Sequence, residues 1–459
     1  MIVVVPLLIW LAPASARPHE FGHVNDPNRG TICHYNQEVD KEHCLELLGW
    51  VDEAWTIQVD GMGLVAPVSD GELGGSDALD IYLSSEGTGG AGGAYVTCDA
   101  GDADECVDAV QGDGRNGASA YIVIDPDTDP AQLRQYVHHE FQHVTQYATD
   151  FAEPSLSTWE GTAMAAERWT DPTAPLDPGP IADYQAAPWA SAVLQDGYFL
   201  DGAYGFEDSW YEYGAATWLL WLDAQHGDGA GSVGPALWAA LAQEGAVNEP
   251  DVLDAWDALL GTGAQATAWK TDLMAFEADR ARMGTDAGPD YLAFAGADAY
   301  AWREGRLQGE DAVTPSSPPY PLGMSLWDRD VDNFDVIELR VDGDNAVEWA
   351  IIAVQGGETS TWWGPDAING SAVWQPPDDG PATIGVINLG GAGFDADNVL
   401  ETASFTLNVT TDYVPPERQE DVGGCACSAA VAPRTNADLA FALGCSGLLA
   451  LITGSRRRA

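Results

Sequence analysis

The stretch Asp129-Pro-Ala-Gln-Leu-Arg-Gln-Tyr-Val-His-His-Glu-Phe-Gln-His-Val-Thr-Gln-Tyr147 is the part of the sequence around which the rest of the chain can be organised. Asp129 is a good helix N-cap and Pro130 suits the first helical position, so the stretch carries a start signal for a helix. The prediction of a helix that runs to Tyr147 therefore does not depend on any motif inside it.

Five consecutive positions of this predicted helix, 139 to 143, read H-E-x-x-H. His139 and His143 are four residues apart and share one face of the helix, where two imidazoles can bind one metal ion. Glu140 projects beside them and could take a proton from a water that the metal activates. Because the motif is short and also arises by chance, the sequence around it has to support the interpretation.

A zinc ion bound by two imidazoles needs a third protein ligand and an open position for water. The segment Trp159-Glu-Gly-Thr-Ala-Met-Ala-Ala-Glu167 follows the motif, and it is predicted to form a second helix with serine or threonine as its cap. Its E-G-x-A-x-x-x-E pattern resembles the gluzincin clan of metallopeptidases, whose third ligand is a glutamate on the helix after the motif helix. The resemblance implies Glu160 as the third ligand of Zn²⁺. Glu167 could support a ligand or lie at the surface.

The segment Tyr211-Glu-Tyr-Gly-Ala215 resembles the Y-x-x-G-A sequence with which the aminopeptidase branch of the clan supplies a tyrosine to the oxyanion. The resemblance implies Tyr211 in this role, with Tyr213 as the alternate; an aromatic residue that only packs at a helix start is an equally open interpretation. The G-x-M-E-N element of those aminopeptidases is absent from the sequence, and no third histidine follows His143 at the metzincin spacing. We therefore expect an endopeptidase-type site.

The chain has 459 residues and a formal net charge of −54, and lysine occurs only at Lys41 and Lys270. Such an acidic chain is not expected to bind nucleic acid or an anionic membrane surface. The charge suits a saline or calcium-rich exterior or a cationic substrate, and it equally serves solubility alone. The Asp- and Gly-rich loop 69–80 could bind Ca²⁺, but it does not match the helix-flanked calcium loop, so an ordinary solvated turn is preferred.

The spacing of apolar residues predicts an α+β fold, and the length predicts two or three domains. The resemblance implies a zincin-like metallopeptidase domain over residues 17–310, in which a small sheet and the motif helix precede a mostly helical part; segment 171–206 shows no helical pattern. Residues 311–412 are predicted to form a β-sandwich, and 413–424 a linker. Strands are predicted at 79–83, 118–124, 334–341, 347–354, 383–389 and 403–410, and helices at 39–59, 159–169, 215–226, 233–244, 250–260 and 264–283.

Both ends of the chain carry patterns typical of export. Residues 1–16 form a short apolar run that ends in Ala-Ser-Ala, and we interpret them as a signal peptide although no basic residue precedes the run. In the tail, 425–459, a cysteine motif, an apolar segment and an arginine cluster together resemble the myxobacterial-type C-terminal sorting signal. The resemblance implies that the tail holds the chain in the membrane until a sorting protease processes it. A plain transmembrane anchor is the alternative.

Four cysteines near the N-terminus lie in two close pairs, Cys33 with Cys44 and Cys98 with Cys106. Two local disulfides are predicted from this proximity, which agrees with an exported protein, although reduced thiols stay open as an interpretation.

Together these features predict a monomeric zinc endopeptidase that acts on proteins or peptides. It would be displayed on the outer surface of a Gram-negative bacterium or secreted after tail processing. Two alternatives stay open: a surface adhesion or calcium-binding protein on a catalytically degenerate zincin scaffold, and a zinc hydrolase that acts on a non-peptide bond.

Overall fold

The computed structural model describes residues 17–86, 93–98, 106, 108–110, 112–173, 176–204, 209–243, 249–260, 268–283, 301–332, 335–355, 359–364, 371–391, 393–396 and 402–411. The predicted signal peptide, the linker 413–424 and the sorting tail 425–459 lie outside these residues. Within the described ranges, no helix is both long enough and apolar enough to cross a membrane. The chain is mixed α and β, as predicted, and it divides into two compact units: Met1–Tyr184 with Val193–Trp269, and Gln185–Ala192 with Lys270–Ala459.

The first unit contains a mixed five-stranded sheet with the strand order β1-β2-β3-β5-β4. The inner pairs β2–β3 and β3–β5 are parallel, and the outer pairs β1–β2 and β4–β5 are antiparallel. Every residue of β3 and β5 is buried, which explains why both strands read as apolar runs in the sequence, interrupted only by Asp80 of β3. The strands are β1 (Gly22–Asp26), β2 (Thr31–Tyr35), β3 (Leu79–Leu83), β4 (Ala94–Cys98) and β5 (Ala120–Ile124).

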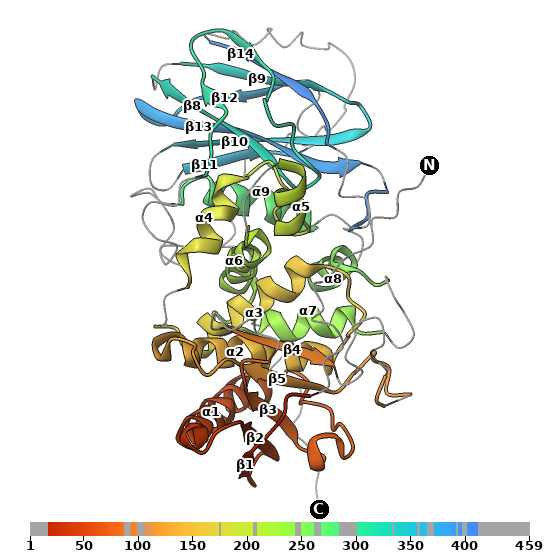
Figure 1. Ribbon diagram of the computed structural model, residues 1–459. Coiled ribbons are helices and arrows are strands. Elements are labelled where there is room, and N and C mark those ends of the chain that lie inside the picture. Colours follow the sequence, from red (N-terminus) through yellow and green to blue (C-terminus); the bar gives the residue numbers. More distant parts are fainter. Residues whose placement is uncertain are drawn as a thin grey trace, which may run out of the picture. The chain divides into compact units, whose positions relative to one another are not determined.

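Helices α1 and α2 cover one face of this sheet, and their apolar side chains share a core with β2, β3 and β5. Figure 1 shows α2 with the strands β4 and β5 on one side and α3 on the other, and α2 contacts all three elements. The helical elements of this unit are η1 (Glu38–Asp40), α1 (Lys41–Ala54), η2 (Trp55–Met62), η3 (Leu73–Gly75), α2 (Pro130–Tyr147), α3 (Leu156–Thr170), α4 (Pro178–Ala186), α5 (Gly197–Tyr204), η5 (Tyr211–Ala215), α6 (Ala216–His226), α7 (Val233–Leu241) and α8 (Val252–Leu260).

Local signals explain where the two long central helices begin. The amides of Gln132 and Leu133 donate to the Asp129 carbonyl, and Pro130 occupies the first turn of α2, as the sequence predicts. Ser155 caps α3, because its hydroxyl accepts a hydrogen bond from the Thr158 amide. Helices α4 and α5 were not predicted. They are short, and their apolar residues do not form the long periodic pattern on which the prediction relied.

Two disulfides stabilise the first unit: Cys33–Cys44 joins β2 to α1, and Cys98–Cys106 joins the last residue of β4 to Cys106. Both predicted pairings are therefore present. Each closes a short local loop, with sequence separations of 11 and 8 residues.

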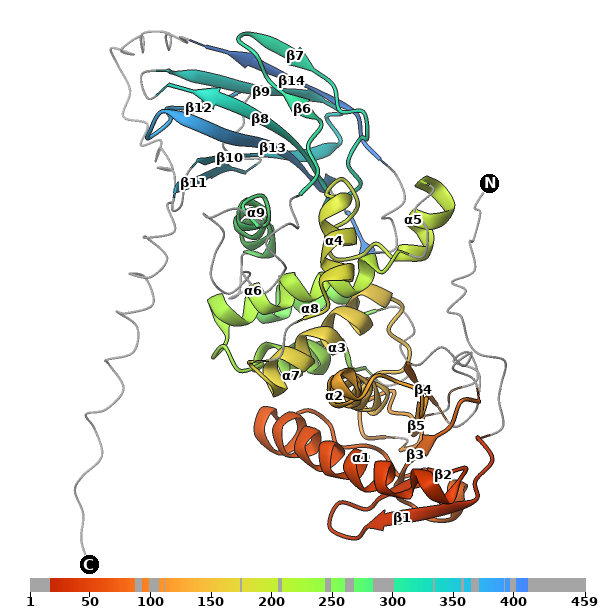
Figure 2. The ribbon, with the colours of Figure 1, turned by 60° about the vertical axis from the view of Figure 1, so that its left-hand side comes forward.

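The second unit is a two-layer β structure. One sheet has the order β11-β10-β13-β8-β6 and the other β12-β9-β14-β7, and apolar residues from both sheets form a single core. Figure 2 shows the two sheets stacked face to face. The elements are α9 (Ala268–Arg280), β6 (Gly305–Arg306), β7 (Asp311–Val313), β8 (Met324–Val331), β9 (Ile337–Gly343), β10 (Val347–Gln355), β11 (Thr359–Trp363), β12 (Ala372–Trp374), β13 (Gly380–Gly391) and β14 (Phe405–Thr410).

Two segments before residue 311 belong to the second unit: Gln185–Ala192, which starts in the last turn of α4, and the stretch from Lys270, which contains most of α9. Lys270 at the start of α9 pairs with Glu348 of β10 at 2.6 Å. The side chain of Gln185 exchanges hydrogen bonds with Arg280 at the end of α9. These contacts join residues far apart in sequence, so periodicity alone could not reveal them.

Candidate metal centre

Three side chains from α2 and α3 converge in the first unit. The Nε2 atoms of His139 and His143 are 3.2 Å apart, and the Glu160 Oε2 atom lies 3.2 Å from the first and 3.3 Å from the second. Ligands bound to tetrahedral zinc at about 2.0–2.1 Å are separated from one another by about 3.3 Å. The three atoms therefore already have the spacing of one face of a zinc coordination tetrahedron, and these residues could hold a metal ion.

The hydrogen bonds around His143 determine which ring nitrogen faces the other two residues as an acceptor. The Gln146 Nε2 amide donates to the Trp159 carbonyl at 3.0 Å, so the Gln146 Oε1 atom points to His143 Nδ1, 2.6 Å away. An amide oxygen only accepts hydrogen bonds, and Nδ1 of His143 must therefore carry a hydrogen. In the neutral ring, Nε2 then presents its lone pair to His139 and Glu160.

His139 is oriented in the same way by a carboxylate. Its Nδ1 lies 2.8 Å from Glu167 Oε1, and the other oxygen of Glu167 accepts a hydrogen bond from Gln135. Glu167 is 7% exposed, so this is a buried charge-assisted contact. A carboxylate behind a histidine is the arrangement that fixes the ring and raises its basicity in metal sites.

The site requires a positive charge at its centre. Two imidazole lone pairs and a carboxylate oxygen face one another, and three acceptors repel unless a proton or a metal ion lies between them. Burial disfavours the charged form of His139, yet contacts with Glu160 and Glu167 raise its pKa well above the ordinary value. Burial would likewise raise the pKa of Glu160, but the two histidines lower it. The donor set of two imidazoles and one carboxylate fits a divalent metal ion.

Close backbone packing connects α3 to the tyrosine-bearing segment η5. A Cβ atom added to Gly161 would lie 3.0 Å from the Cβ of Ala215 and 3.2 Å from backbone atoms of Ala215 and Ala216. Glycine at this position lets the turn that carries Glu160 approach η5, which explains the E-G pair of the motif.

Of the two predicted tyrosines, Tyr213 lies at the histidines. Its ring stacks on His139 with centroids 5.7 Å apart, and its side chain interacts with the Glu160 carboxylate. Tyr211 is 1% exposed and packs against Tyr184, with centroids 5.0 Å apart. The structure thus brings Tyr213, the alternate candidate, beside His139 and Glu160.

A cavity of about 800 Å³ opens beside the cluster, and its lining includes His139, Glu140, Glu167 and Tyr213. Gly93 and Ala94, at the start of the edge strand β4, form part of the wall. Glu140 is 7% exposed, and burial raises the pKa of its carboxyl against the opposing effect of the two histidines. All residues of this cavity come from the first unit.

The sequence analysis did not identify Gln146 and Gln135 as partners of His143 and of Glu167, although the spacing of residues on the helix could have indicated both. Gln146 lies three residues after His143 and Gln135 four residues before His139, and on a helix these spacings place side chains together. By contrast, the contact between His139 and Glu167 joins α2 to α3 and depends on how the two helices pack. Comparison of the chain with known protein families gave no match, and comparison with curated proteins gave none either.

Proposed function

We propose that the chain is an exported zinc-dependent endopeptidase with a zincin-like catalytic domain, and that it hydrolyses peptide bonds in protein or peptide substrates. The convergence of the His139, His143 and Glu160 ligand atoms at 3.2–3.3 Å from one another, beside a cavity that contains Glu140, carries the proposal. His139, His143 and Glu160 would hold Zn²⁺. When bound, the ion would lower the pKa of a water molecule and polarise the substrate carbonyl.

Glu140 is the general base of the proposed reaction. It takes a proton from the attacking water and later delivers it to the leaving amine of the peptide. A base works best when its pKa lies near the working pH, and burial moves the pKa of Glu140 upward, in that direction. Its place in the cavity wall gives it access to a substrate.

Tyr213 is the proposed donor to the oxyanion that forms as water attacks the peptide carbonyl. Burial and the nearby carboxylates of Glu160, Glu212 and Glu140 raise the pKa of its hydroxyl well above the ordinary value. The hydroxyl therefore keeps its proton and can donate it in a hydrogen bond. Its stacking on His139 holds the ring beside the proposed zinc ligands.

The edge strand β4 supports a peptide rather than a small molecule as the substrate. Among the described strands β4 pairs only with β5, and we propose that an extended peptide binds along its other edge as an added strand. Its first residue, Ala94, lines the cavity. A peptide aligned on β4 would pass the histidines with its backbone carbonyls fixed by main-chain hydrogen bonds.

The two disulfides support action in an oxidising compartment. We propose display at the outer surface of a Gram-negative bacterium, or release, after a sorting protease has processed the tail 425–459 that would hold the chain in the membrane. The strong negative charge of the chain agrees with an extracellular protein that does not bind nucleic acid.

The test is hydrolysis of a mixed peptide pool by the full chain, followed by mass spectrometry, with and without a zinc chelator. We expect internal cleavage that the chelator removes and zinc restores. Glu140→Gln should lower the rate by about 10²- to 10⁴-fold without changing the zinc content, whereas Glu46→Gln, an exposed change on α1, should have no effect.

Each alternative has its own outcome in this experiment. Cleavage that persists in Glu140→Gln would exclude Glu140 as the base. Zinc binding without cleavage of any peptide would favour a hydrolase of another bond, and a chain that binds no zinc would favour an adhesion or calcium-binding protein.

A further inference from the structure

A second group of potential metal ligands lies at the opposite edge of the same sheet from β4. His23 on β1 and His34 on β2 are directly paired across the antiparallel strands, and Glu20 lies just before β1. The ligand atoms of these three residues lie within 4.8 Å of one another. Glu20 Oε2 contacts His34 Nδ1 and lies 3.8 Å from His23 Nδ1.

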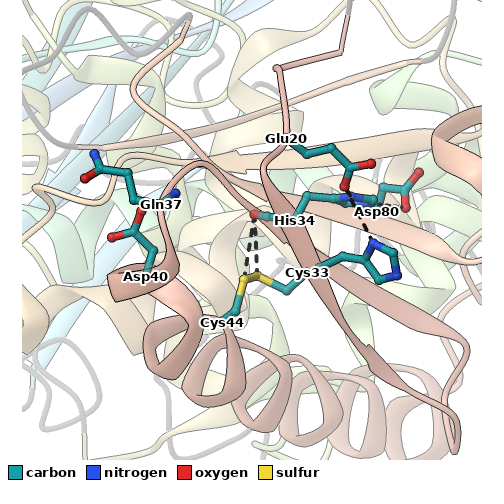
Figure 3. The surroundings of a disulfide bond; sticks show 8 residues. Glu20, Cys33, His34, Gln37, Asp40, Cys44 and Asp80 are labelled. Carbon is teal, nitrogen blue, oxygen red and sulfur yellow. Dashed lines mark hydrogen bonds and ion pairs between the residues drawn. A yellow bond between two sulfur atoms is a disulfide. The ribbon is translucent and has the colours of Figure 1, made fainter.

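The strand β3 holds His34 in place from the other side. His34 Nε2 lies 2.8 Å from Asp80 Oδ1, and the His34 ring stacks on Tyr82 with centroids 4.5 Å apart. Figure 3 shows the Glu20 and Asp80 carboxylates at the His34 side chain, next to the Cys33–Cys44 disulfide. The disulfide joins β2 to α1 at Cys33, the residue before His34, and it therefore restrains the position of the His34 backbone.

The buried carboxylate of Asp80 determines how His34 can act. The Asp80 side chain is 0% exposed and the His34 side chain 2% exposed, so the hydrogen bond between them is buried. Because an ionised carboxylate only accepts hydrogen bonds, Nε2 of His34 is the donor. The neutral ring then presents the Nδ1 lone pair to Glu20, and two acceptors in contact require a proton or a metal ion between them. A carboxylate behind a histidine is the same supporting arrangement that Glu167 gives His139.

The ion pairs that link His34 to Glu20, Asp80, Arg17 and Asp70 have a net negative charge. Glu20, Asp70 and Asp80 contribute three negative charges, and Arg17, which pairs with Asp70 and Asp80, contributes one positive charge. Two negative charges are left when His34 is neutral, which is the charge that one divalent cation balances. A proton on His34 would balance only one of them.

We propose that Glu20, His23 and His34 form a second metal site, which binds Zn²⁺ or a similar divalent ion with imidazole and carboxylate ligands. The site is separate from the centre formed by His139, His143 and Glu160. Glu20 and His23 have half-exposed side chains, 44% and 51%, and can move toward an ion, while the buried His34 is the fixed ligand. A bound ion would fasten the N-terminal segment to the edge of the sheet and stabilise the folded first unit.

The experiment titrates the metal-stripped full chain with Zn²⁺ by isothermal titration calorimetry. The intact chain should bind about two ions and His143→Ala about one, because that variant loses the first centre. Adding His23→Ala or Glu20→Gln to His143→Ala should weaken the remaining site by at least about tenfold. His43→Ala, at an exposed histidine of α1, serves as the control and should leave both sites intact.

A second measurement tests the proposal if the His143→Ala variant does not fold. In the otherwise unchanged chain, His23→Ala and Glu20→Gln should each reduce the zinc content by about one ion and abolish part of the zinc-dependent rise in melting temperature. The proposal is overturned if both variants bind zinc with the stoichiometry and affinity of the parent chain. Loss of zinc in His23→Ala but not in His143→Ala would contradict the first centre and leave the second intact.

Discussion

Replacement of Glu167 by glutamine tests whether this residue, which is not one of the three proposed ligands, sets the zinc affinity of the proposed site. In the native arrangement one oxygen of Glu167 accepts from His139 Nδ1 at 2.8 Å, and the other accepts from the Gln135 amide. Glutamine has the same shape but only one acceptor. Whichever way its amide turns, an NH₂ group faces either the His139 N–H or the Gln135 NH₂, so one hydrogen bond is lost.

The size of the effect follows from the contact that is lost. A hydrogen bond to a charged group contributes about 1.5–3 kcal/mol, and this corresponds to a loss of about 10- to 100-fold in zinc affinity. The same range is typical when the partner behind a metal-binding histidine is removed. The dissociation constant is measured by competition with a chelator of known affinity, and Glu46→Gln on the exposed face of α1 is the matched control.

A double variant separates this explanation from general damage to the fold. Gln135→Met removes the competing donor, so in the Glu167→Gln background the amide oxygen can turn to His139 and recover part of the affinity. Zinc affinity of Glu167→Gln equal to that of the parent chain would refute the role of Glu167. A double variant that binds no more tightly than Glu167→Gln would refute the donor conflict as its cause.

Three further predictions concern the surroundings of the site. Tyr213→Phe should lower kcat by about 10²- to 10³-fold with zinc content unchanged, and Tyr211→Phe should lower it far less; a larger loss in Tyr211→Phe would reverse the two roles. Gly161→Ala should force α3 and η5 apart and lower the free energy of unfolding by about 1–3 kcal/mol in urea titrations; unchanged stability would show that the backbone contact is readily relieved. Burial raises the pKa of Asp150 to about 6 from an ordinary value of 3.8. The folded protein therefore binds this proton more tightly than the unfolded chain does, and the stability that the protonated Asp150 contributes is lost as the pH rises from about 4 to about 6. Relative to the parent chain, Asp150→Asn should therefore gain on the order of 2–3 kcal/mol in unfolding free energy between pH values of about 4 and 7, and parallel pH profiles of the two proteins would contradict this.

Features with a local cause could be predicted well from the sequence. The helix α2 has its cap and first-turn proline beside it in the chain, and the spacing of four residues places His139 and His143 on one face. The two disulfides join cysteines that are close in sequence. The central strands β3 and β5 are recognisable because burial on both faces makes their residues apolar, with Asp80 of β3 as the exception.

The sequence could not determine which of the two neighbouring tyrosines, Tyr211 or Tyr213, contacts His139. Tyr211 matches the sequence pattern, but the short helical segment η5 turns the Tyr213 ring onto His139 and buries Tyr211 against Tyr184. Residues two apart on a helical turn point in different directions, and only the packing of η5 on α3 decides which of them faces the histidines. The contacts of Gln185 with Arg280 and of Lys270 with Glu348 also join residues far apart in the sequence, so they have the same kind of cause.

The sequence by itself determined the two histidines and the glutamate of H-E-x-x-H, because a helix fixes their relative positions within little more than one turn. Only the tertiary structure decided that Glu160 Oε2 lies 3.2 and 3.3 Å from the two Nε2 atoms, that Glu167 orients His139, and that Glu20, His23 and His34 gather at the far edge of the sheet. These contacts join separate helices and strands. Their geometry depends on how the elements pack, and no spacing along one element contains that information.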